Sequence, residues 1–177
     1  PNPSKTRLWN RLYPSPTSLP EPPYWHGYDS LPASTGRNVK IQKTAKEMIV
    51  SPSLLSANFG NLQADMDWLN RSSADWLHID IMDGVFVPNI SFGFPVLKHV
   101  AKLCEKPLDV HLMIVQPEKF IPEVKALGAY MMNVHYEACP HLHRVVGQIH
   151  EAGMKAGVTL NPATPVEVLR DIIQDVD

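Results

Sequence analysis

One apolar run near the middle of the chain contains a histidine and an aspartate two residues apart, in the stretch Trp76-Leu77-His78-Ile79-Asp80-Ile81-Met82. On a strand, alternate side chains point to opposite faces, so His78 and Asp80 share one face. A buried carboxylate without a partner is energetically costly, so Asp80 needs a cation, a metal ion or a proton. Taken alone, the stretch is equally typical of a hydrogen-bonded pair and of part of a metal site.

A second apolar stretch, Asp109-Val110-His111-Leu112-Met113, favours the metal site. It follows Pro107 and carries a single histidine in its middle. Two imidazoles and one carboxylate from neighbouring parallel strands are a common ligand set for a divalent transition metal, and they leave coordination positions open for a substrate. The sequence therefore predicts a metal site formed by His78, Asp80 and His111.

Three separated motifs resemble the ribulose-phosphate 3-epimerase family in their order and separation. They are Ser51-Pro52-Ser53-Leu54-Leu55-Ser56-Ala57, then His78-Ile79-Asp80-Ile81-Met82-Asp83-Gly84 followed by Phe86-Val87-Pro88-Asn89, and finally Asp109-Val110-His111-Leu112-Met113. The resemblance runs from about Met48 to Asp177. It implies an isomerase of the pentose phosphate pathway that epimerises D-ribulose 5-phosphate at C3 to D-xylulose 5-phosphate, by two-base proton transfer through an enediolate.

The resemblance also implies roles for individual residues. One divalent metal ion (Fe, Zn, Mn or Co) would be bound by His78, Asp80 and His111. Asp80 would also act as one of the two catalytic carboxylates. The substrate would be contacted by Ser53 and His111 through polar groups and by Met82 and Met113 through an apolar lining.

The chain departs from the family pattern in its last part. The family's second catalytic aspartate, which is also a metal ligand, lies on a later strand in an Asp-Gly-Gly setting, and neither this motif nor the glycine-rich phosphate loops occur here. We expect the intact parent protein to be an active epimerase and this chain alone to be inactive. Two alternatives stay open, a hexulose-6-phosphate 3-epimerase on the same scaffold and a barrel fragment without catalysis. A related decarboxylase would need lysine at the position of Met82.

Other polar residues receive more ordinary expectations. Asp83 is expected to cap the turn at Gly84, and His135 is expected to support the pocket or pack beside it rather than bind the metal. Glu137, His141 and His143 are expected to be solvated.

Bulk composition restricts the partners. The formal net charge is -2 and 44% of residues are hydrophobic, so the chain lacks the basic surface that nucleic acid requires. No apolar run approaches the ~18 residues that span a bilayer. Cys104 and Cys139 are far apart in sequence and suggest no disulfide. We expect a cytoplasmic protein with a small sugar-phosphate substrate, no nucleic acid and no membrane partner, and we leave a homo-oligomer open.

Residues 1–47 differ from the rest, since they hold eight of the 17 prolines and more basic than acidic side chains. Such a segment buries too little apolar surface to offset its conformational entropy. We predict a disordered, proline-rich, basic extension over 1–47 and a partial barrel domain over 48–177. We favour a natural start at Met48, and the alternative is an organelle transit peptide.

From Met48 onward, strand and helix patterns alternate. The predicted strands are Met48–Ser53, Trp76–Asp80, Leu108–Met113, Tyr130–His135 and Lys155–Leu160. The predicted helices are Asn61–Asn70, Pro95–Cys104, Pro117–Lys125, Cys139–Glu151 and Pro165–Gln174.

Five βα units indicate an α/β fold with a parallel sheet, either doubly wound or part of a (βα)8 TIM barrel. We favour the barrel of the ribulose-phosphate-binding type, because polar residues end several strands, as they do where barrels carry their chemistry. A dinucleotide fold would instead want Gly-x-Gly-x-x-Gly after its first strand. The 130 residues after Glu47 fit only about five of eight units, so we expect a truncated chain.

Overall fold

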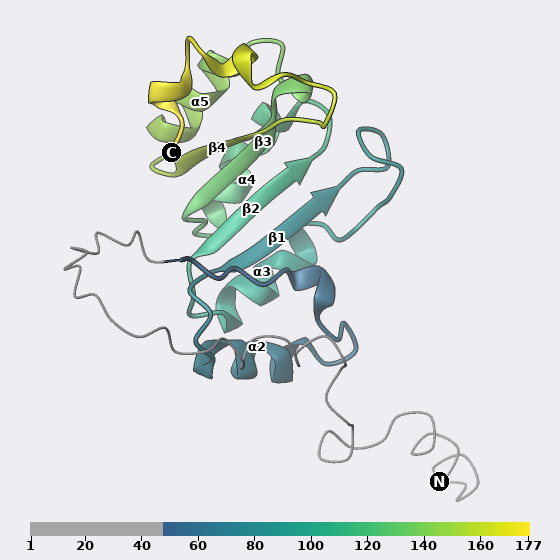
Figure 1. The fold of residues 1–177 in the computed structure, drawn as a ribbon. Helices are drawn as coiled ribbons and strands as arrows, with labels where there is room; N and C mark the ends of the chain where they lie inside the picture. Colours follow the sequence, from purple (N-terminus) through teal and green to yellow (C-terminus); the bar gives the residue numbers. More distant parts are fainter. Residues whose placement is uncertain (1–47) are drawn as a thin grey trace, which may run out of the picture. The chain divides into compact units, whose positions relative to one another are not determined.

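The structure is a computed structural model that describes residues 48–177 (Figure 1). The predictions for residues 1–47, including the disordered extension and the transit peptide, lie outside the described residues. Within 48–177 the elements alternate between strands and helices, as the α/β prediction requires.

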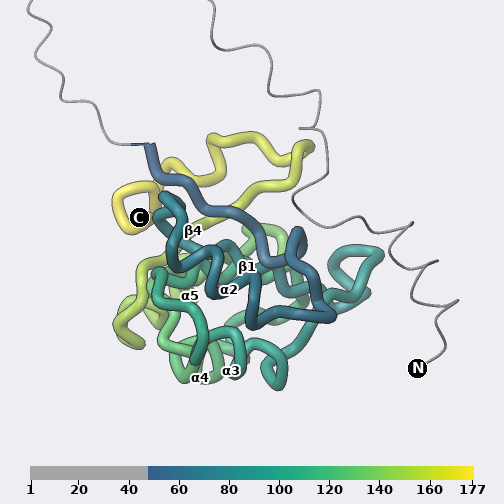
Figure 2. The backbone as a smooth tube through the Cα atoms, turned by 90° about the horizontal axis from the view of Figure 1, so that it is seen from below, coloured from purple at the N-terminus to yellow at the C-terminus, as the bar shows by residue number. Residues whose placement is uncertain are grey.

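Four parallel strands form one sheet in the order β1-β2-β3-β4. Their bounds are Leu77–Met82 for β1, Leu108–Met113 for β2, Met131–His135 for β3 and Lys155–Thr159 for β4. The connecting helices gather on one side of this sheet, as the two views in Figures 1 and 2 show. This is the arrangement of consecutive βα units of a partial barrel, and it confirms the predicted fold class.

The helices have the bounds Leu62–Arg71 for α2, Phe94–Leu103 for α3, Ile121–Ala126 for α4 and Leu142–Glu151 for α5. Two single 3-10 turns, η1 (Leu54–Ser56) and η3 (Tyr136–Ala138), follow the first extended segment and β3. Helix α5 starts three residues later than predicted. Cys139 precedes Pro140, which disfavours helical backbone, and Cys139 has an extended ψ of 87°.

The core lies between the sheet and the helices. The side chains of Leu77, Ile79 and Ile81 on β1 alternate with half-buried neighbours, and all three are buried. Strand β2 repeats this pattern with Leu108, Val110 and Leu112. The apolar set of each strand therefore faces the helices, and the alternate residues, including His78, Asp80 and His111, face the opposite side.

The predicted strand Met48–Ser53 is wrong. The segment instead makes one isolated parallel bridge, between Ser53 and His78. Its carbonyls accept hydrogen bonds from β1, with His78 N–H donating to Pro52 at 2.9 Å and Trp76 N–H donating to Val50 at 3.2 Å. Pro52 has no N–H to return, so a continuous ladder cannot form there.

The predicted helix Pro117–Lys125 divides into a 3-10 turn, η2 (Pro117–Phe120), and the short α4. Pro122 explains the division, because it has no N–H to donate to the carbonyl of Glu118 four residues earlier.

The predicted helix Pro165–Gln174 is wrong. Two 3-10 turns occupy this segment, η4 (Val166–Leu169) and η5 (Ile173–Asp175). Of these residues only Leu169 is buried, whereas Val166 is 66% exposed and Ile173 is 52% exposed. Val168 and Ile172 are only partly buried against the core. A short helix depends on packing of an apolar face, and β-branched residues add little intrinsic helix preference, so this limited packing does not hold a regular helix.

A membrane-spanning segment would need a longer and more apolar helix than any found between residues 48 and 177.

The packing of α5 against the sheet makes a quantitative prediction. Ile149 is fully buried, so Ile149→Ala is expected to lower the free energy of unfolding by about 2–5 kcal/mol through lost burial and a residual cavity. Ile173→Ala is the matched control, because that side chain is half exposed, and it is expected to change stability by less than about 0.5 kcal/mol. Urea unfolding measures both variants, and equal losses would contradict the observed packing.

Candidate metal centre

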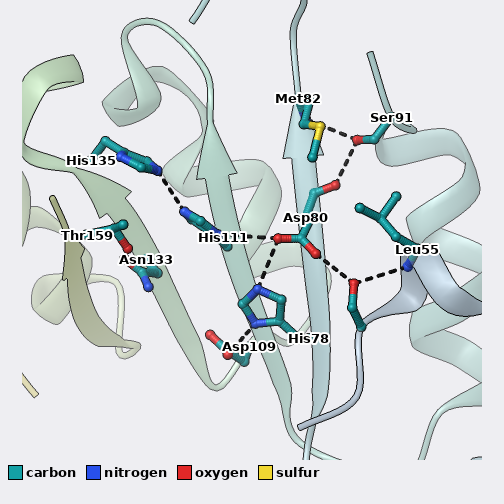
Figure 3. Close-up of polar contacts among 11 residues, drawn as sticks. Leu55, His78, Asp80, Met82, Ser91, Asp109, His111, Asn133, His135 and Thr159 are labelled. Atoms are coloured by element: carbon teal, nitrogen blue, oxygen red, sulfur yellow. Dashed lines mark hydrogen bonds and ion pairs between the residues drawn. The ribbon is translucent and has the colours of Figure 1, made fainter. Parts of the chain in front are cut away.

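The pairing of β1 with β2 places the residues of the candidate site beside one another in successive pairs. In the parallel register His78 lies beside Asp109, Asp80 beside His111, and Met82 beside Met113. The alternating burial of both strands puts all these side chains on the face away from the helices. Figure 3 shows His78, Asp80, Met82, Asp109 and His111 among them. Every residue predicted for the site on β1 and β2 is therefore brought to one surface.

Asp80 lies at the centre of this group, with its side chain 13% exposed. Its Oδ1 lies 3.0 Å from Nε2 of His78 and 3.3 Å from Nδ1 of His111. Its Oδ2 accepts a hydrogen bond of 2.7 Å from Oγ of Ser53. Burial raises the pKa of Asp80, but the hydrogen bonds from His111, His78 and Ser53 outweigh burial and hold the pKa well below its usual value.

His78 bridges two carboxylates. Its Nδ1 lies 2.7 Å from Oδ2 of Asp109, and its Nε2 faces Asp80. The hydrogen bond to Asp109, followed by that to Asp80, raises the pKa of His78 from 6.5 to about 10. Without a metal ion, the protonated imidazole of His78 therefore lies between the carboxylates of Asp80 and Asp109 and attracts both.

The donor atoms fit a divalent metal ion. One ligand atom from each of His78, Asp80 and His111 lies within 4.8 Å of the others. Asp109 engages the far nitrogen of His78, which is the usual way in which a carboxylate orients a metal-binding histidine. Ser53 engages Oδ2 of Asp80 and leaves Oδ1 directed at the two imidazoles. The chain thus contains a possible His-Asp-His metal site.

Ser91, which was not predicted from the sequence, makes two hydrogen bonds to the backbone near the end of β1. Its Oγ donates to the carbonyl of Asp80 at 2.7 Å and accepts from the N–H of Met82 at 3.0 Å (Figure 3). No local pattern indicates this contact, because Ser91 returns to the strand only after a loop. Ser91 therefore fixes the backbone on which the central carboxylate is mounted.

The loop between Met82 and Ser91 is tied at its base by Asp83. Oδ1 of Asp83 accepts from the N–H groups of Val85 and Phe86, and Oδ2 accepts from the N–H of Val115. Gly84 has a φ of 74°, a conformation that side chains disfavour. The expectation that Asp83 caps this turn is confirmed.

The third strand adds a third histidine, His135, beside the site. Nε2 of His135 lies 2.9 Å from Nε2 of His111, and their rings are stacked with centroids 5.0 Å apart. Burial, followed by the nearby His111, lowers the pKa of His135. His135 lies beside His111 and is not among the converging ligand atoms, as expected.

The remaining candidates lie farther from the ligands. His141 and His143 are exposed, as predicted. Glu137 is not simply solvated, because its Oε1 accepts from the N–H of Asn161 and from the hydroxyl of Thr164. Burial raises the pKa of Glu137, but these two hydrogen bonds lower it by more than burial raises it. The net pKa is therefore below its usual value.

The hydrogen bond between His78 and Asp109 yields a pH prediction for the metal-free protein. Because the folded pKa of His78 is raised, its stabilising contribution is fully present below the ordinary value of about 6.5 and is lost as the pH rises toward 10. Asp109→Asn is expected to lower the pKa of His78 and to reduce this loss of stability between pH 6 and 9. NMR titration of the ring and urea unfolding at both pH values measure the two effects.

Asp171→Asn is the control for that experiment, since Asp171 is exposed and distant in sequence from the site. An unchanged pKa for His78 in Asp109→Asn would contradict the hydrogen-bond assignment.

Comparison with known proteins identifies the family of the chain. Ribulose-phosphate 3-epimerase of Bacillus subtilis (strain 168) is 48% identical over 128 residues, which are 72% of this chain and 59% of that protein. The chloroplastic ribulose-5-phosphate-3-epimerase of Arabidopsis thaliana is 46% identical over 133 residues, which are 74% of this chain and 47% of that protein. The chain thus spans about half to three fifths of the length of these relatives.

The fold is also found in a more distant protein. The crystal structure of tryptophan synthase subunit alpha from Legionella pneumophila str. Paris matches with a TM-score of 0.51 and 18% identity, over 73% of this chain and 59% of that chain. A sequence model of the ribulose-phosphate 3 epimerase family matches residues 49–177. The chain belongs to the ribulose-phosphate 3-epimerase family.

Proposed function

We propose that residues 48–177 provide the metal-binding part of an enzyme that epimerises D-ribulose 5-phosphate at C3 to D-xylulose 5-phosphate. The observation that carries the proposal is the convergence of His78, Asp80 and His111 on the sheet face away from the helices, within 4.8 Å of one another. Enzymes of this family act on a sugar-phosphate substrate. The relatives' names support the pentulose over the hexulose phosphate.

Epimerisation beside a carbonyl requires removal of the C3 proton, which leaves negative charge on the substrate's oxygens. A bound divalent ion, which we propose to be Fe, Zn, Mn or Co, would supply Lewis-acid stabilisation of that charge. The ion would be held by His78, Asp80 and His111. Its ligand set of two imidazoles and one carboxylate suits these metals.

Asp80 is proposed to take the proton. A general base must be ionised, and the depressed pKa of Asp80 keeps it so. The hydroxyl of Ser53 holds Oδ2, and the hydroxyl of Ser91 holds the Asp80 carbonyl, so the carboxylate has a defined orientation. Inversion of C3 needs a second acid/base group on the opposite face, and we assign Asp80 to one face only.

The substrate contacts proposed here follow from the same surface. Ser53 and His111 lie directly against Asp80 and carry polar groups that can bind hydroxyl or carbonyl oxygens. Met82 and Met113 are paired in the next layer of the sheet and are half-buried. Their flexible apolar side chains would line the pocket beside the reacting carbons and reduce access of water.

The metal site is tested by metal uptake. The 177-residue chain is expected to bind one Co²⁺ per chain, and His111→Ala is expected to abolish this binding because one of three ligands is removed. His143→Ala is the matched control, since His143 has a side chain that is 74% exposed. Equilibrium dialysis with metal analysis measures both. Equal binding by wild type and His111→Ala would contradict the assigned ligands.

The chemistry is tested by exchange at C3, because exchange with solvent needs one base whereas inversion needs two. In D2O with Co²⁺, the wild-type chain is expected to incorporate deuterium at C3 of ribulose 5-phosphate faster than Asp80→Asn by about 10²-fold or more. NMR of the sugar measures exchange and any xylulose 5-phosphate formed. Equal rates in the two proteins would exclude Asp80 as the base.

The same measurement with a hexulose 6-phosphate distinguishes the two substrate classes. Faster exchange with the hexulose phosphate would overturn the proposed substrate while leaving the site intact.

A further inference from the structure

His135 has an unusual environment for its residue type. Among residues 48–177 it is the one charged or polar residue that is almost wholly buried, with 6% of its surface exposed. Its ring packs against two others, His111 at a centroid distance of 5.0 Å and Phe86 at 4.7 Å. A histidine enclosed in this way has a fixed ring angle.

The short contact between the two histidines restricts their protons. Nε2 of His111 and Nε2 of His135 are 2.9 Å apart, so one nitrogen must donate and the other must accept. The other nitrogen of His111, Nδ1, faces Oδ1 of Asp80 at 3.3 Å. When Nδ1 gives its lone pair to a metal ion, the ring proton of His111 lies on Nε2, and Nε2 of His135 is the acceptor.

The acceptor role then determines the proton on His135. A neutral imidazole that accepts at Nε2 carries its hydrogen on Nδ1. Nδ1 of His135 is buried without a hydrogen-bond partner and faces Oε2 of Glu137 at 3.6 Å, longer than a hydrogen bond but close enough for charge attraction. The carboxylate of Glu137 thus favours the Nδ1–H tautomer of His135, which is also the tautomer required when Nδ1 of His111 binds a metal ion.

The orientation of Glu137 is itself fixed. Its other oxygen, Oε1, accepts from the N–H of Asn161 at 2.8 Å and from the hydroxyl of Thr164. These donors come from the segment that follows β4, so Oε2 is left directed at His135. Contacts therefore run in a line from Glu137 through His135 to His111 and Asp80. Figure 3 shows the part of this line from His135 to Asp80.

We propose that His135, supported by Glu137, is a positioning residue that accepts a hydrogen bond from Nε2–H of His111 and so fixes the tautomer and ring angle in which Nδ1 of His111 faces the metal. This inference rests on the proposed metal site. It gives His111 a neutral partner, whereas His78 has the carboxylate of Asp109. Partners of this kind orient ligating histidines, and their loss weakens metal binding.

The first test compares two substitutions of His135 by Zn²⁺ affinity. His135→Phe keeps an aromatic ring but removes the acceptor, and it is expected to weaken Zn²⁺ binding on the order of 10–100-fold. His135→Gln keeps a side-chain acceptor and is expected to recover part of the affinity. His143→Phe is the control at an exposed histidine and is expected to leave affinity unchanged.

The second test uses Glu137→Gln. The two donors from Asn161 and Thr164 hold the amide oxygen at Oε1, so the amide N–H group, with its partial positive charge, faces Nδ1 of His135. That favours the Nε2–H tautomer of His135 and opposes the N–H of His111. We expect weaker Zn²⁺ binding in Glu137→Gln, and no additional loss when Glu137→Gln is combined with His135→Phe. Fully additive losses would contradict the line of contacts.

The third test reads the tautomer directly and does not depend on activity. In the Zn²⁺-loaded wild-type protein, long-range ¹H–¹⁵N spectra are expected to show His111 protonated at Nε2 and His135 protonated at Nδ1. The reverse assignment for either ring would overturn the inference, even if the His135 variants fail to fold.

Failure of the metal centre and failure of this inference give different results. Absence of Zn²⁺ binding by the wild-type chain would overturn both. Tight binding by wild type with equally tight binding by folded His135→Phe would overturn the positioning role alone.

Discussion

The register between β1 and β2 is the constraint on which the site depends. Leu77, Ile79 and Ile81 must enter the core with Leu108, Val110 and Leu112, and in that register Asp80 lies beside His111. Because side chains alternate along a strand, a slip of one residue would turn the imidazoles toward the helices and the leucines toward solvent. The apolar core therefore sets the spacing of the ligands. Burial of six aliphatic side chains specifies a geometry that the polar groups alone would not maintain.

The polar groups carry an electrostatic cost that their neighbours offset. Asp80 and Asp109 are both largely removed from water, and two like charges on one face of neighbouring strands repel. His78 lies between them as a proton-carrying bridge, which explains its high pKa. In the proposed metal site, an ion bound at Nε2 would replace that proton with a stronger positive charge. The same arrangement would then stabilise the metal-free fold and hold the proposed ligands in place for the ion.

Local patterns in the sequence predicted the part of the site that lies on strands. His78, Asp80 and His111 could be assigned to one face because strand alternation needs only the residues of that strand. Ser91 and the contact between His135 and His111 could not be found in this way, because they depend on where a loop returns and on which strands are neighbours. A sheet order of β1-β2-β3 brings His135 to His111, and the pattern in each strand contains no record of that order.

The wrong prediction of a helix over Pro165–Gln174 has the same origin. Apolar spacing over Pro165–Gln174 is typical of a helix, yet that spacing does not report how far the apolar face is covered, and only Leu169 is fully buried. The resemblance to a family did not prevent these wrong predictions of individual elements. The prediction of a strand over Met48–Ser53 was wrong for a different reason, because Pro52 within the segment limits its pairing with β1.

The loop from Asp83 to Ile90 divides two tasks between its base and its tip. Its base is closed by an antiparallel bridge between Asp83 and Ile90, and Ser91 next to that bridge secures Asp80. Its tip includes Val85, which is 73% exposed and makes no demand on the core. Substitutions of Val85 can therefore change the surface of this loop without disturbing the hydrogen bonds that hold Asp80. One end of the loop is free to vary while the other stays constant.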